Sequence, residues 1–330
     1  MKKIVAIDHG NRGTKSCSAL STSLPGEKGK LICINFASSF IDSTIQGSHG
    51  GDRLDFNGKE YTLVDCRFYQ KDDKTADDDY FLLTLFAIGK QVLADLNCYK
   101  EMVQDGYVEI DLLVGVPPMH KKEIGAKFAK YFQREGKQIS FRINDTPMII
   151  KITNVHVYPQ GVATTALNHL WAIVDSRDTV NIVDIGGYTV DCIRINNGQP
   201  DIVESLYIGV NILLDEVNSR INAKIGKRMT DSNIEGIIQK KAKSLNGCSN
   251  ERQALVFDLT QKLTVKLLAA VSQQGIDLRE DYTIFVGGGA IALKKYILDT
   301  GMIGDAYFED DIFANAKGYL AAYNQMSKKA

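Results

Sequence analysis

Three short apolar segments of this chain end in a glycine turn, and the first two carry an aspartate beside that turn. They are residues 4–15 (IVAIDHGNRGTK), residues 182–191 (IVDIGGYTVD) and residues 284–290 (IFVGGGA). Glycine lets the backbone approach a phosphate closely and direct several N–H groups at it. A helix that begins at such a turn adds its positive N-terminal end. The three turns therefore predict phosphate binding.

The aspartates Asp8 and Asp184 indicate what else these turns bind. A carboxylate beside a phosphate would repel it unless a cation lay between the two groups. Mg²⁺ is suited to this position, because it binds few carboxylates together with several waters and phosphate oxygens. Lys15 could then neutralise charge on the outer phosphates.

Each turn also has an ordinary interpretation when it is taken alone. Gly10 with Gly13 is equally compatible with a simple hairpin turn, and a Gly186-Gly187 pair closes many tight turns. Asp191, after the second turn, shifts the balance there toward function. Neither a G-x-x-x-x-G-K-[ST] phosphate loop nor a G-x-G-x-x-G dinucleotide fingerprint occurs at any of the three turns. The prediction depends on the set of turns and not on any one of them.

The elements expected to position these turns alternate between strands and helices, which predicts an α/β fold. An Asn57-Gly58 pair, which favours a tight hairpin turn, divides the segment 53–64. The other predicted strands are residues 3–7, 15–20, 109–116, 138–143, 148–158, 179–185, 189–195 and 282–286. The predicted helices are residues 80–96, 121–134, 160–174, 252–272 and a helix from 290, with 210–246 mostly helical.

The composition is that of an ordinary globular protein long enough for two domains. The chain has 330 residues, 44% hydrophobic and 24% charged, with 39 basic and 40 acidic residues and a net charge of −1. This balance argues against direct nucleic-acid binding, which calls for a basic face. The longest apolar runs, residues 81–88 and 267–271, are far shorter than the roughly 20 residues of a membrane span.

The reactive side chains are dispersed along the sequence. Six cysteines occur without a C-x-x-C pair, and five histidines occur without the spacing of a metal-binding pair. Asp8 and His9 interrupt the apolar stretch after Lys2 and Lys3, so the start does not fit a signal peptide. These features predict reduced thiols, a cytoplasmic location, no membrane association and no metal held by protein side chains alone.

In order and spacing, the turns resemble those of the actin, sugar kinase and heat-shock chaperone superfamily. The segment 10–15 is similar to its first phosphate loop, 184–191 to its second and 287–289 to its adenosine loop. Within the superfamily the chain resembles most the ParM/StbA-type plasmid-segregation actins and their archaeal relatives. Four stretches carry this likeness over nearly the whole chain: 56–61 (FNGKEY), 114–117 (VGVP), 157–161 (VYPQG) and 313–319 (FANAKGY).

The resemblance implies a role for each matching residue. Asp8 would hold the water shell of Mg²⁺, and Asp184 would hold Mg²⁺ or the attacking water. The expected nucleotide ligands are Gly10, Asn11, Gly13, Thr14 and Lys15 in the first loop, Gly186, Gly187, Tyr188 and Thr189 in the second, and Gly287, Gly288 and Gly289 around the adenosine. The implied cofactors are Mg²⁺ and ATP, with GTP left open.

Gln160 lies where the family keeps the residue that positions the hydrolytic water. ParM-type proteins have Glu there, and a Gln cannot act as a general base at neutral pH. Gln160 is therefore expected to orient water, together with the catalytic residues Asp8 and Asp184, and hydrolysis is expected to be slow. A Gln after a proline is also a common helix start. Tyr188 replaces a small hydroxyl residue, which leaves its own phosphate contact open.

The fold implied is the actin-like ATPase fold, with two similar ribonuclease-H-like domains around a nucleotide cleft. Domain I would comprise residues 1–165, with a small subdomain at about 34–84. Domain II would comprise residues 166–310, with a small subdomain at about 215–281. Residues 311–330 would form a helix returning to domain I. The function implied is an ATPase whose filaments form with Mg²⁺-ATP and fall apart after hydrolysis, segregating plasmid DNA through an adaptor bound at a centromere-like site.

Two alternatives of the same fold remain open at the level of sequence. A monomeric phosphotransferase, such as a sugar or acetate kinase, would need a carboxylate base by the second loop, where Asp191 is the only spare acid. A non-hydrolysing scaffold would not need Asp8, Lys15 and Asp184, all of which are present. An exposed loop at 43–51 is also expected, in the region where actins contact the next subunit.

Overall fold

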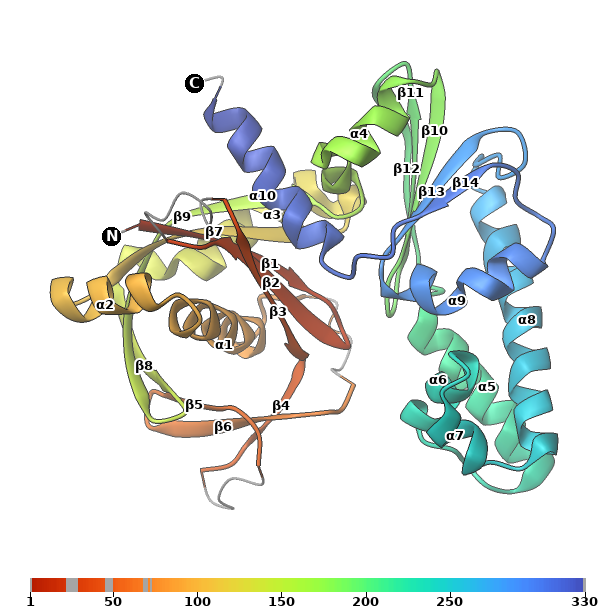
Figure 1. Cartoon of the computed structure of the whole chain (residues 1–330), viewed down its shortest axis with the longest axis horizontal. Helices are drawn as coiled ribbons and strands as arrows, with labels where there is room; N and C mark the ends of the chain where they lie inside the picture. The colour runs from red at the N-terminus through yellow and green to blue at the C-terminus, as the bar shows by residue number, and fades with distance from the viewer. Residues whose placement is uncertain (1, 22–28, 45–49, 68–70, 72, 329–330) are drawn as a thin grey trace. The chain divides into compact units, whose positions relative to one another are not determined.

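The computed structural model describes residues 2–21, 29–44, 50–67, 71 and 73–328. It divides into two compact units (Figure 1). Unit 1 comprises Met1–Leu167 and Phe313–Ala330, and unit 2 comprises Asn168–Ile312. Most of the expected loop at 43–51 falls on residues 45–49, outside the described residues.

Unit 1 is built on a mixed sheet whose described strands are joined in one nine-stranded ladder. The strands are β1 (Lys2–His9), β2 (Gly13–Ala19), β3 (Leu31–Ala37), β4 (Ser39–Asp42), β5 (Arg53–Phe56), β6 (Lys59–Val64), β7 (Val108–Val116), β8 (Gln138–Ile143) and β9 (Thr146–Pro159). Their order across the sheet is β3-β2-β1-β7-β9-β8-β5-β6-β4. The helices are α1 (Asp79–Leu93), α2 (Leu96–Asp105), α3 (Lys121–Gln133) and α10 (Ala314–Ser327), with 3₁₀ turns η1 (Pro118–His120), η2 (Arg134–Gly136) and η3 (Val162–Ala166).

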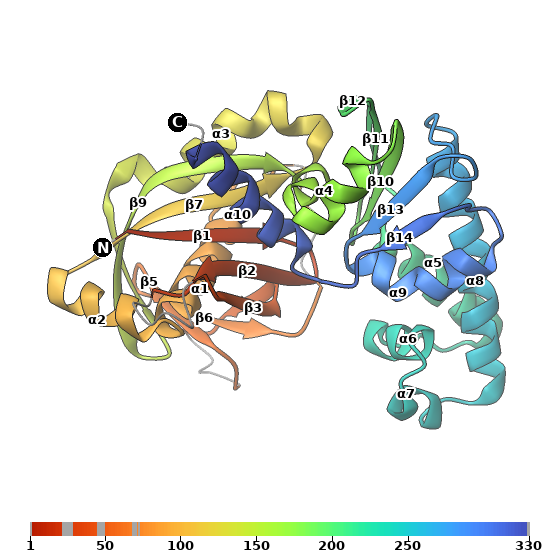
Figure 2. The same ribbon diagram turned by 45° about the horizontal axis from the view of Figure 1, so that its top comes forward.

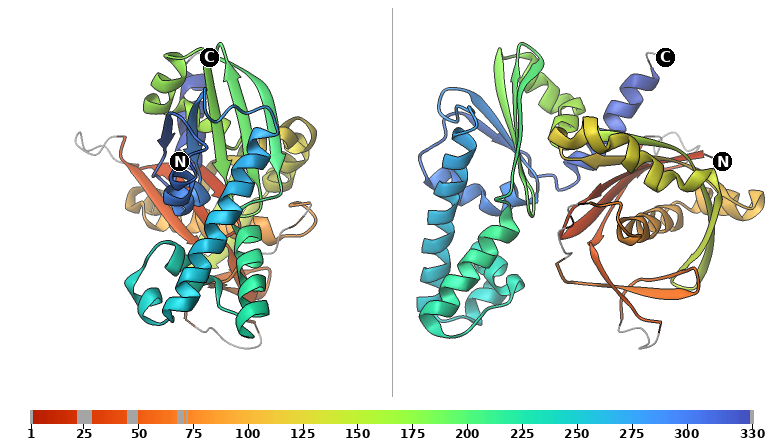
Figure 3. Two further views of the ribbon diagram at one scale, coloured as in Figure 1. Left: turned by 90° about the vertical axis from the view of Figure 1, so that its right-hand side faces the viewer. Right: turned by 180° about the vertical axis from the view of Figure 1, so that it is seen from behind.

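The sheet of unit 1 curls around α1, which lies inside the curve (Figures 1 and 3). Twelve of the 15 residues of α1 are buried, and the helix packs against β1, β2, β3, β5 and β8. A helix that is apolar on all sides requires such an environment, because it has no face to present to water. The curled sheet therefore supplies the apolar surroundings that α1 needs on its sides.

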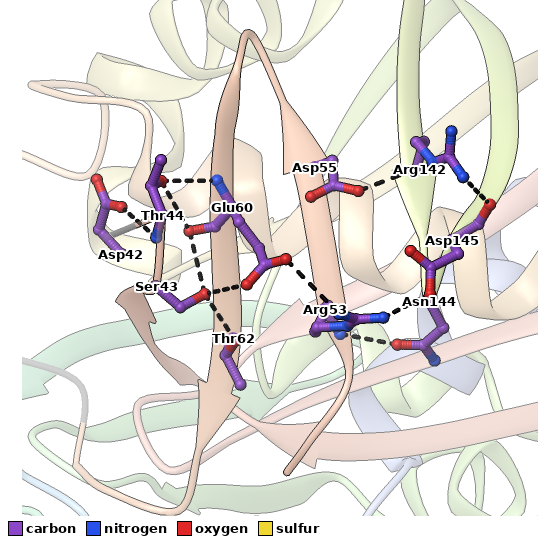
Figure 4. Close-up of polar contacts among 10 residues, drawn as sticks. All are labelled: Asp42, Ser43, Thr44, Arg53, Asp55, Glu60, Thr62, Arg142, Asn144 and Asp145. Atoms are coloured by element: carbon purple, nitrogen blue, oxygen red, sulfur yellow. Dashed lines mark hydrogen bonds and ion pairs between the residues drawn. The ribbon is translucent and has the colours of Figure 1, made fainter. Parts of the chain in front are cut away.

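Polar side chains connect β5 to β8, where the curled sheet has its shortest backbone ladder (Figure 4). The ladder between β5 and β8 pairs only Leu54 with Ile143 and Asp55 with Arg142. The turn after β8 supplements it, because Asn144 Oδ1 accepts a 2.8 Å hydrogen bond from the backbone N–H of Arg53. These bonds hold the two strands together where backbone pairing is short.

The outer face of the same sheet is covered by α10, which packs on β1, β2 and β7 (Figure 2). Asp111 fixes this helix to the sheet, since it accepts hydrogen bonds from Lys2 at 2.7 Å and from Tyr323 at 2.8 Å. Burial alone would raise the pKa of Asp111, but the hydrogen bonds from Lys2, Asn154 and Tyr323 hold it below the usual range. The end of the chain is thereby part of unit 1.

Unit 2 contains a five-stranded sheet with helices packed on it. Its elements are α4 (Asn168–Asp175), β10 (Thr179–Ile185), β11 (Val190–Asn196), β12 (Gln199–Leu206), α5 (Val210–Ile225), α6 (Asp231–Ile238), α7 (Ala242–Asn246), α8 (Asn250–Ser272), β13 (Tyr282–Val286), α9 (Gly288–Asp299) and β14 (Ala306–Phe308). The strand order is β12-β11-β10-β13-β14. Apolar side chains of α5, α6, α8 and α9 share one core with those of the sheet.

The two units repeat one strand arrangement. In unit 1, β3-β2-β1 form an antiparallel meander, and β7 and β9 follow in parallel to β1. In unit 2, β12-β11-β10 form the same meander, and β13 and β14 follow in parallel to β10. Each unit thus has the core expected of a ribonuclease-H-like domain, and the predicted α/β class is confirmed.

One predicted hairpin turn is confirmed by the structure, whereas one predicted helix is not. The hairpin turn at Asn57-Gly58 is confirmed, with φ of 50° and 76° at the two turn residues. The helix predicted over 160–174 is wrong, because only η3 and α4 form there, separated by an extended Leu167. Gly161 has φ of 68°, and the Thr164 hydroxyl donates to the Gly161 carbonyl, which competes with helical hydrogen bonding.

The helix predicted over 80–96 is likewise interrupted, because α1 ends at Leu93 and α2 begins at Leu96. Asp95 explains the break, since its carboxylate caps α2 at the Cys98 N–H and forms a buried 2.6 Å ion pair with Lys3. Among the described residues, no single helix passes the length and hydropathy test for crossing a membrane. The pair α1–α2 passes it only when joined, across a bend of 103°.

Candidate functional site

The first glycine turn connects β1 to β2 at one end of the sheet of unit 1. The Gly10 N–H donates to the Asp8 carbonyl at 3.0 Å, and this bond turns the chain. Asp8 and Lys15 then lie directly opposite each other in the antiparallel ladder, so their side chains emerge on the same face. Asp8 Oδ2 lies 3.8 Å from Lys15 Nζ, and both side chains are largely buried. The hairpin thus pairs a carboxylate with an ammonium group.

Gln160 joins this pair although it lies 152 residues after Asp8 in the chain. Its Nε2 donates a 2.9 Å hydrogen bond to Asp8 Oδ1. Since a carboxylate only accepts hydrogen bonds, the amide nitrogen must be the atom that faces Asp8. The backbone N–H of Gln160 donates to the Val116 carbonyl at 2.9 Å, which fixes the residue just after β9.

Gly115 makes the approach of Gln160 to Asp8 sterically possible. It lies on β7, the strand between β1 and β9. A Cβ placed on Gly115 would lie 3.0 Å from Gln160 Cγ and would overlap the ring of Tyr319. A larger residue at this position would therefore displace the glutamine, and the stretch 114–117 contains this glycine without showing what it packs against.

The two glycines of the first turn leave room beside the Asp8–Lys15 pair. A Cβ on Gly10 would lie 2.7 Å from both Lys15 Nζ and the Gly13 carbonyl oxygen. A Cβ on Gly13 would lie 2.7 Å from Asn35 Oδ1. A side chain at position 10 would fill space beside the lysine, and one at position 13 would push against β3, so both glycines fit a closely packed anion-binding turn.

The side chain of Thr14 is part of the support of the first turn. Its side chain is fully buried, and its hydroxyl lies 2.9 Å from the Ser38 hydroxyl. The Ser38 hydroxyl in turn donates to the Gly10 carbonyl. Only the backbone of Thr14 can therefore face a ligand, whereas Asn11 is partly exposed in the turn. Ser38 fixes the loop from inside, and no sequence motif marked it.

His9, within the first turn, is buried and neutral. Burial, together with the charge of Lys74, lowers its pKa to about 3. Its Nε2 lies 2.8 Å from the Thr84 hydroxyl, which itself donates to the Tyr80 carbonyl. His9 must therefore donate through Nε2, and its stacking on Phe132 fixes the ring. This residue is part of the support of the loop and is not a proton carrier.

The second glycine turn connects β10 to β11 in unit 2 and has the same hairpin geometry. The Gly186 N–H donates to the Thr189 carbonyl at 2.9 Å, which closes the turn. That bond uses the Gly186 amide within the loop, so an amide contact to phosphate depends on Gly187. Tyr188 and Thr189 are partly exposed at the tip of the turn. Asp184 is buried, with only 6% of its surface exposed.

A fourth glycine, Gly209, supports the second turn from behind. It directly precedes α5, and a Cβ on it would lie 2.6 Å from the backbone of Gly187 and Tyr188. The first N–H groups of α5 donate to this turn, from Val210 to the Gly186 carbonyl at 3.0 Å and from Asn211 to the Gly187 carbonyl at 2.7 Å. The sequence signal was present, since Gly209 is another glycine between a strand and a helix.

The third glycine turn lies beside the second, because β13 runs parallel to β10. Gly287 has φ of 90°, and a Cβ on it would overlap Asp184 Oδ1. Gly288 is exposed with open space around it. Gly289 is buried against Ile185 and Val210. Gly288 is therefore the most exposed member of the triplet, while Gly289 allows α9 to pack closely on the sheet.

The structure brings Asp8, Lys15 and Gln160 together in unit 1, and Asp184 and Gly287 together in unit 2. Within the described residues, no group of three or more His, Cys, Asp or Glu side chains is arranged to hold a metal ion. A cation at either turn would need further ligands from water or from a bound phosphate.

Comparisons with known proteins agree with this architecture. Residues 6–162 match the family model of the actin-like protein N-terminal domain. Residues 182–299 match the model of the C-terminal part of archaeal MreB-like actin homologues. A search of curated protein sequences finds no match.

Similar solved structures extend over nearly the full chain. A 15-stranded ParM filament from Clostridium botulinum has a TM-score of 0.72 at 17% identity, covering 98% of this chain and 99% of that chain. The archaeal actin homologue Ta0583 in complex with ADP has a TM-score of 0.66 at 18% identity, with coverages of 98% and 99%. The filament of AlfA from B. subtilis plasmid pLS32 has a TM-score of 0.60 at 14% identity, with coverages of 96% and 98%.

At these identities the structural likeness shows the fold, and the two family models add matches in both units. The repeated five-stranded core and the glycine hairpins at corresponding strand ends agree with that fold. The chain belongs to the actin-like proteins.

Proposed function

We propose that this protein is an ATPase that binds Mg²⁺-ATP and assembles with copies of itself into filaments, which disassemble after hydrolysis. One observation carries the proposal: Asp8, Lys15 and Gln160 converge at the end of β1 from three different segments. A carboxylate, an ammonium group and a primary amide in contact are suited to binding a metal-bound phosphate and a water molecule.

The residues present fit such a ligand. Gly10 lacks the Cβ atom that would occupy the space beside Lys15. Asp8 and Asp184 would hold Mg²⁺ through its water shell, which requires no protein cage. When bound, Mg²⁺ would neutralise charge on the phosphates and so ease attack by water.

Lys15 provides the positive charge of the first loop. Its ammonium group lies 3.8 Å from Asp8, close enough to be oriented by that carboxylate but beyond a direct hydrogen bond. The group therefore keeps donors available for the β- and γ-phosphates. The backbones of Asn11, Gly13 and Thr14 would complete this side of the nucleotide site.

Gln160 orients the attacking water in this proposal. Its Nε2 is held by Asp8, so Oε1 is the atom left to accept a hydrogen bond from water. An amide oxygen does not take up a proton at neutral pH, so Gln160 positions water without deprotonating it. Slow hydrolysis follows, which would let a filament grow before its subunits release phosphate.

Unit 2 contributes backbone groups in this proposal. The Gly187 amide would donate to phosphate, and Asp184 would hold Mg²⁺ or the attacking water. Gly287 and Gly288 would line the adenosine, where exposed Gly288 offers space for a flat ring. Tyr188 and Thr189 lie at the tip of the second turn and would close over the ligand.

The proposal also includes filament formation and a cellular role for the filaments. The similar structures include filaments of ParM and AlfA, the latter from a plasmid. We propose that this chain also polymerises, in the cytoplasm, and segregates plasmid DNA. With a net charge of −1 it would contact DNA through a separate adaptor at a centromere-like site.

A pelleting assay with Mg²⁺-ATP tests the proposal. We expect polymer that forms with Mg²⁺-ATP, decays as phosphate is released and is absent when EDTA removes Mg²⁺. Lys100→Ala, an exposed lysine of α2, is the matched control for charge loss and should polymerise like the wild type. Soluble protein that phosphorylates a sugar or acetate would instead support a monomeric phosphotransferase and contradict the proposal.

Asp184→Ala separates assembly from turnover. We expect this variant to form polymer with Mg²⁺-ATP that persists, because the group holding Mg²⁺ or the attacking water is removed. Light scattering after ATP addition measures the decay. If the variant disassembles at the wild-type rate, the role assigned to Asp184 is wrong.

A further inference from the structure

Two cysteines of unit 1 face each other across neighbouring strands. Cys17 on β2 and Cys33 on β3 are direct partners in the antiparallel ladder, and their Sγ atoms lie 2.8 Å apart. No disulfide bond joins them in the structure. Their separation of 16 residues in sequence gives no motif, so only the strand register brings them together.

The strand geometry is compatible with a disulfide bond at this position. Directly opposed residues of antiparallel strands have Cα atoms about 4.5–5.5 Å apart, within the range of about 4.4–6.8 Å seen in disulfides. Their Cβ atoms, at about 4.5–5.5 Å, must move slightly closer to reach about 3.5–4.5 Å. A bond formed under such strain is more easily reduced than a structural disulfide.

The two thiols differ in access. Cys17 is fully buried in the apolar cluster beneath α10, which includes Ala6 and Leu113. Cys33 is only partly buried and lies on β3, which ends the described ladder of the sheet. A reagent from solution would therefore contact Cys33 first, with Cys17 adjacent to complete the reaction.

The other four cysteines lack this arrangement. Cys98 and Cys192 are buried, and burial raises their pKa to about 11 and about 12, so both stay protonated. Cys66 is exposed and Cys248 is partly buried. Neither has a second thiol in contact within the part of the chain that the structure describes. These four serve as internal controls for the pair.

We propose that Cys17 and Cys33 form a reversible redox modification site that reacts with small-molecule disulfides. The Cys33 thiolate attacks one sulfur of a disulfide RSSR, forms a mixed disulfide and releases the first RS⁻. The Cys17 thiolate then attacks Cys33 Sγ, forms the Cys17–Cys33 bond and releases the second RS⁻. The two protein thiols are oxidised, RSSR is reduced, and the two protons pass through solvent to give two RSH.

The bond would join β2 to β3 close to the first glycine turn. β2 begins at Gly13, whose missing Cβ leaves space against Asn35 of β3. Oxidation would therefore fix the register of the two strands that continue from this turn. The proposal stands independently of ATP binding, because its readout is the state of the thiols.

Mass spectrometry of the reduced full-length chain after incubation with oxidised glutathione tests the site. We expect two thiols to be lost without a glutathione adduct on either residue, and a Cys17–Cys33 linked peptide that dithiothreitol separates. Cys17→Ser should retain a glutathione adduct on Cys33, whereas in Cys33→Ser the buried Cys17 should stay unmodified. Cys248 should form no disulfide bond with another cysteine of the chain in any sample.

Three results would overturn the proposal. They are a stable glutathione adduct on Cys33 of the wild type, a disulfide between two chains through Cys33, and failure of both thiols to react. Thermal unfolding of each serine variant shows whether it is folded. Should a variant not fold, the peptide map of the wild type decides alone.

Discussion

The two aspartate-bearing hairpins have the same backbone arrangement but oppose different residues. In unit 1 Asp8 faces Lys15 across the ladder, whereas in unit 2 Asp184 faces Asp191. Directly opposed opposite charges stabilise a strand pair, and directly opposed like charges destabilise it. Asp191 is 3% exposed and accepts a hydrogen bond from the Ser205 hydroxyl.

The difference indicates two ways of building a glycine hairpin with a buried aspartate. The first loop is organised by side chains, namely the Asp8–Lys15–Gln160 contacts and the Ser38 hydroxyl. The second is shaped by close backbone packing at Gly209 and Gly287, which admit no Cβ. Side-chain removal should therefore damage the first loop most, whereas addition of a methyl group should damage both loops, since a Cβ on Gly10 would lie 2.7 Å from the Gly13 carbonyl oxygen.

Lys15→Ala is expected to have the largest effect, because it removes the ammonium group that faces Asp8 across the first hairpin. Removing one charge that stabilises the transferring phosphate lowers the turnover number by roughly 100-fold or more. Phosphate release in the presence of Mg²⁺-ATP measures this, with Lys100→Ala as the surface control. Wild-type turnover in Lys15→Ala would show that the first loop does not contact the phosphates.

Gly287→Ala is the corresponding change for the second loop. Its Cβ would overlap Asp184 Oδ1 at a φ of 90°, so we expect a loss of about 1–3 kcal/mol in the free energy of unfolding. Gly288→Ala is the matched control, since that residue has open space around it and should change stability by less than about 0.5 kcal/mol. Urea unfolding compares the two, and equal losses would contradict backbone control of this loop.

His9, in the first loop, makes the free energy of unfolding depend on pH. The corresponding residue in the second loop is Ile185, which follows Asp184 and does not titrate. The pKa of His9 is lowered from 6.5 to about 3 in the folded state. As pH falls through 6.5, the unfolded chain binds a proton that the folded chain does not, so stability is lost. Between pH 7.5 and 5.5 this amounts to about 1 kcal/mol.

His9→Leu should remove this contribution. Urea unfolding at the two pH values, compared between variant and wild type, isolates the single proton because the other groups are common to both. An unchanged pH dependence in the variant would mean that His9 is protonated in the folded protein.

Ser38→Ala is expected to have the smallest effect. It removes the hydroxyl that joins the Gly10 carbonyl to Thr14, which costs about 0.5–1.5 kcal/mol of stability. A small decrease in ATP affinity should accompany this, because the loop loses its internal support. Wild-type stability would show that the hydroxyl bonds contribute nothing.

Sequence reasoning identified what is local and missed what depends on packing. Asp8, Lys15 and the glycines follow from a strand, a turn and a strand, so their mutual contact is predictable. Thr14 was expected to contact the phosphates, and strand alternation places its side chain inside, which leaves its backbone for that contact. Ser38 and Gly115 act through the sheet order and through clearances to other segments, which no residue pattern records.

The sequence also failed to predict one edge strand of unit 2 and the break between α1 and α2. The edge strand β12 contains Pro200 and is partly or fully exposed along its length, so it lacks an apolar period. The break before α2 depends on the buried Lys3–Asp95 pair, which joins residues 92 positions apart. Such contacts appear only once the fold is known.

Calorimetric titration of the folded chain with Mg²⁺-ATP tests the central claim most directly. The account predicts one nucleotide per chain, with affinity lowered at least about tenfold by Lys15→Ala in unit 1 and by Gly287→Ala in unit 2. Lys100→Ala should bind like the wild type. Absence of binding by the wild type, or wild-type affinity in either loop variant that remains folded, would contradict the account.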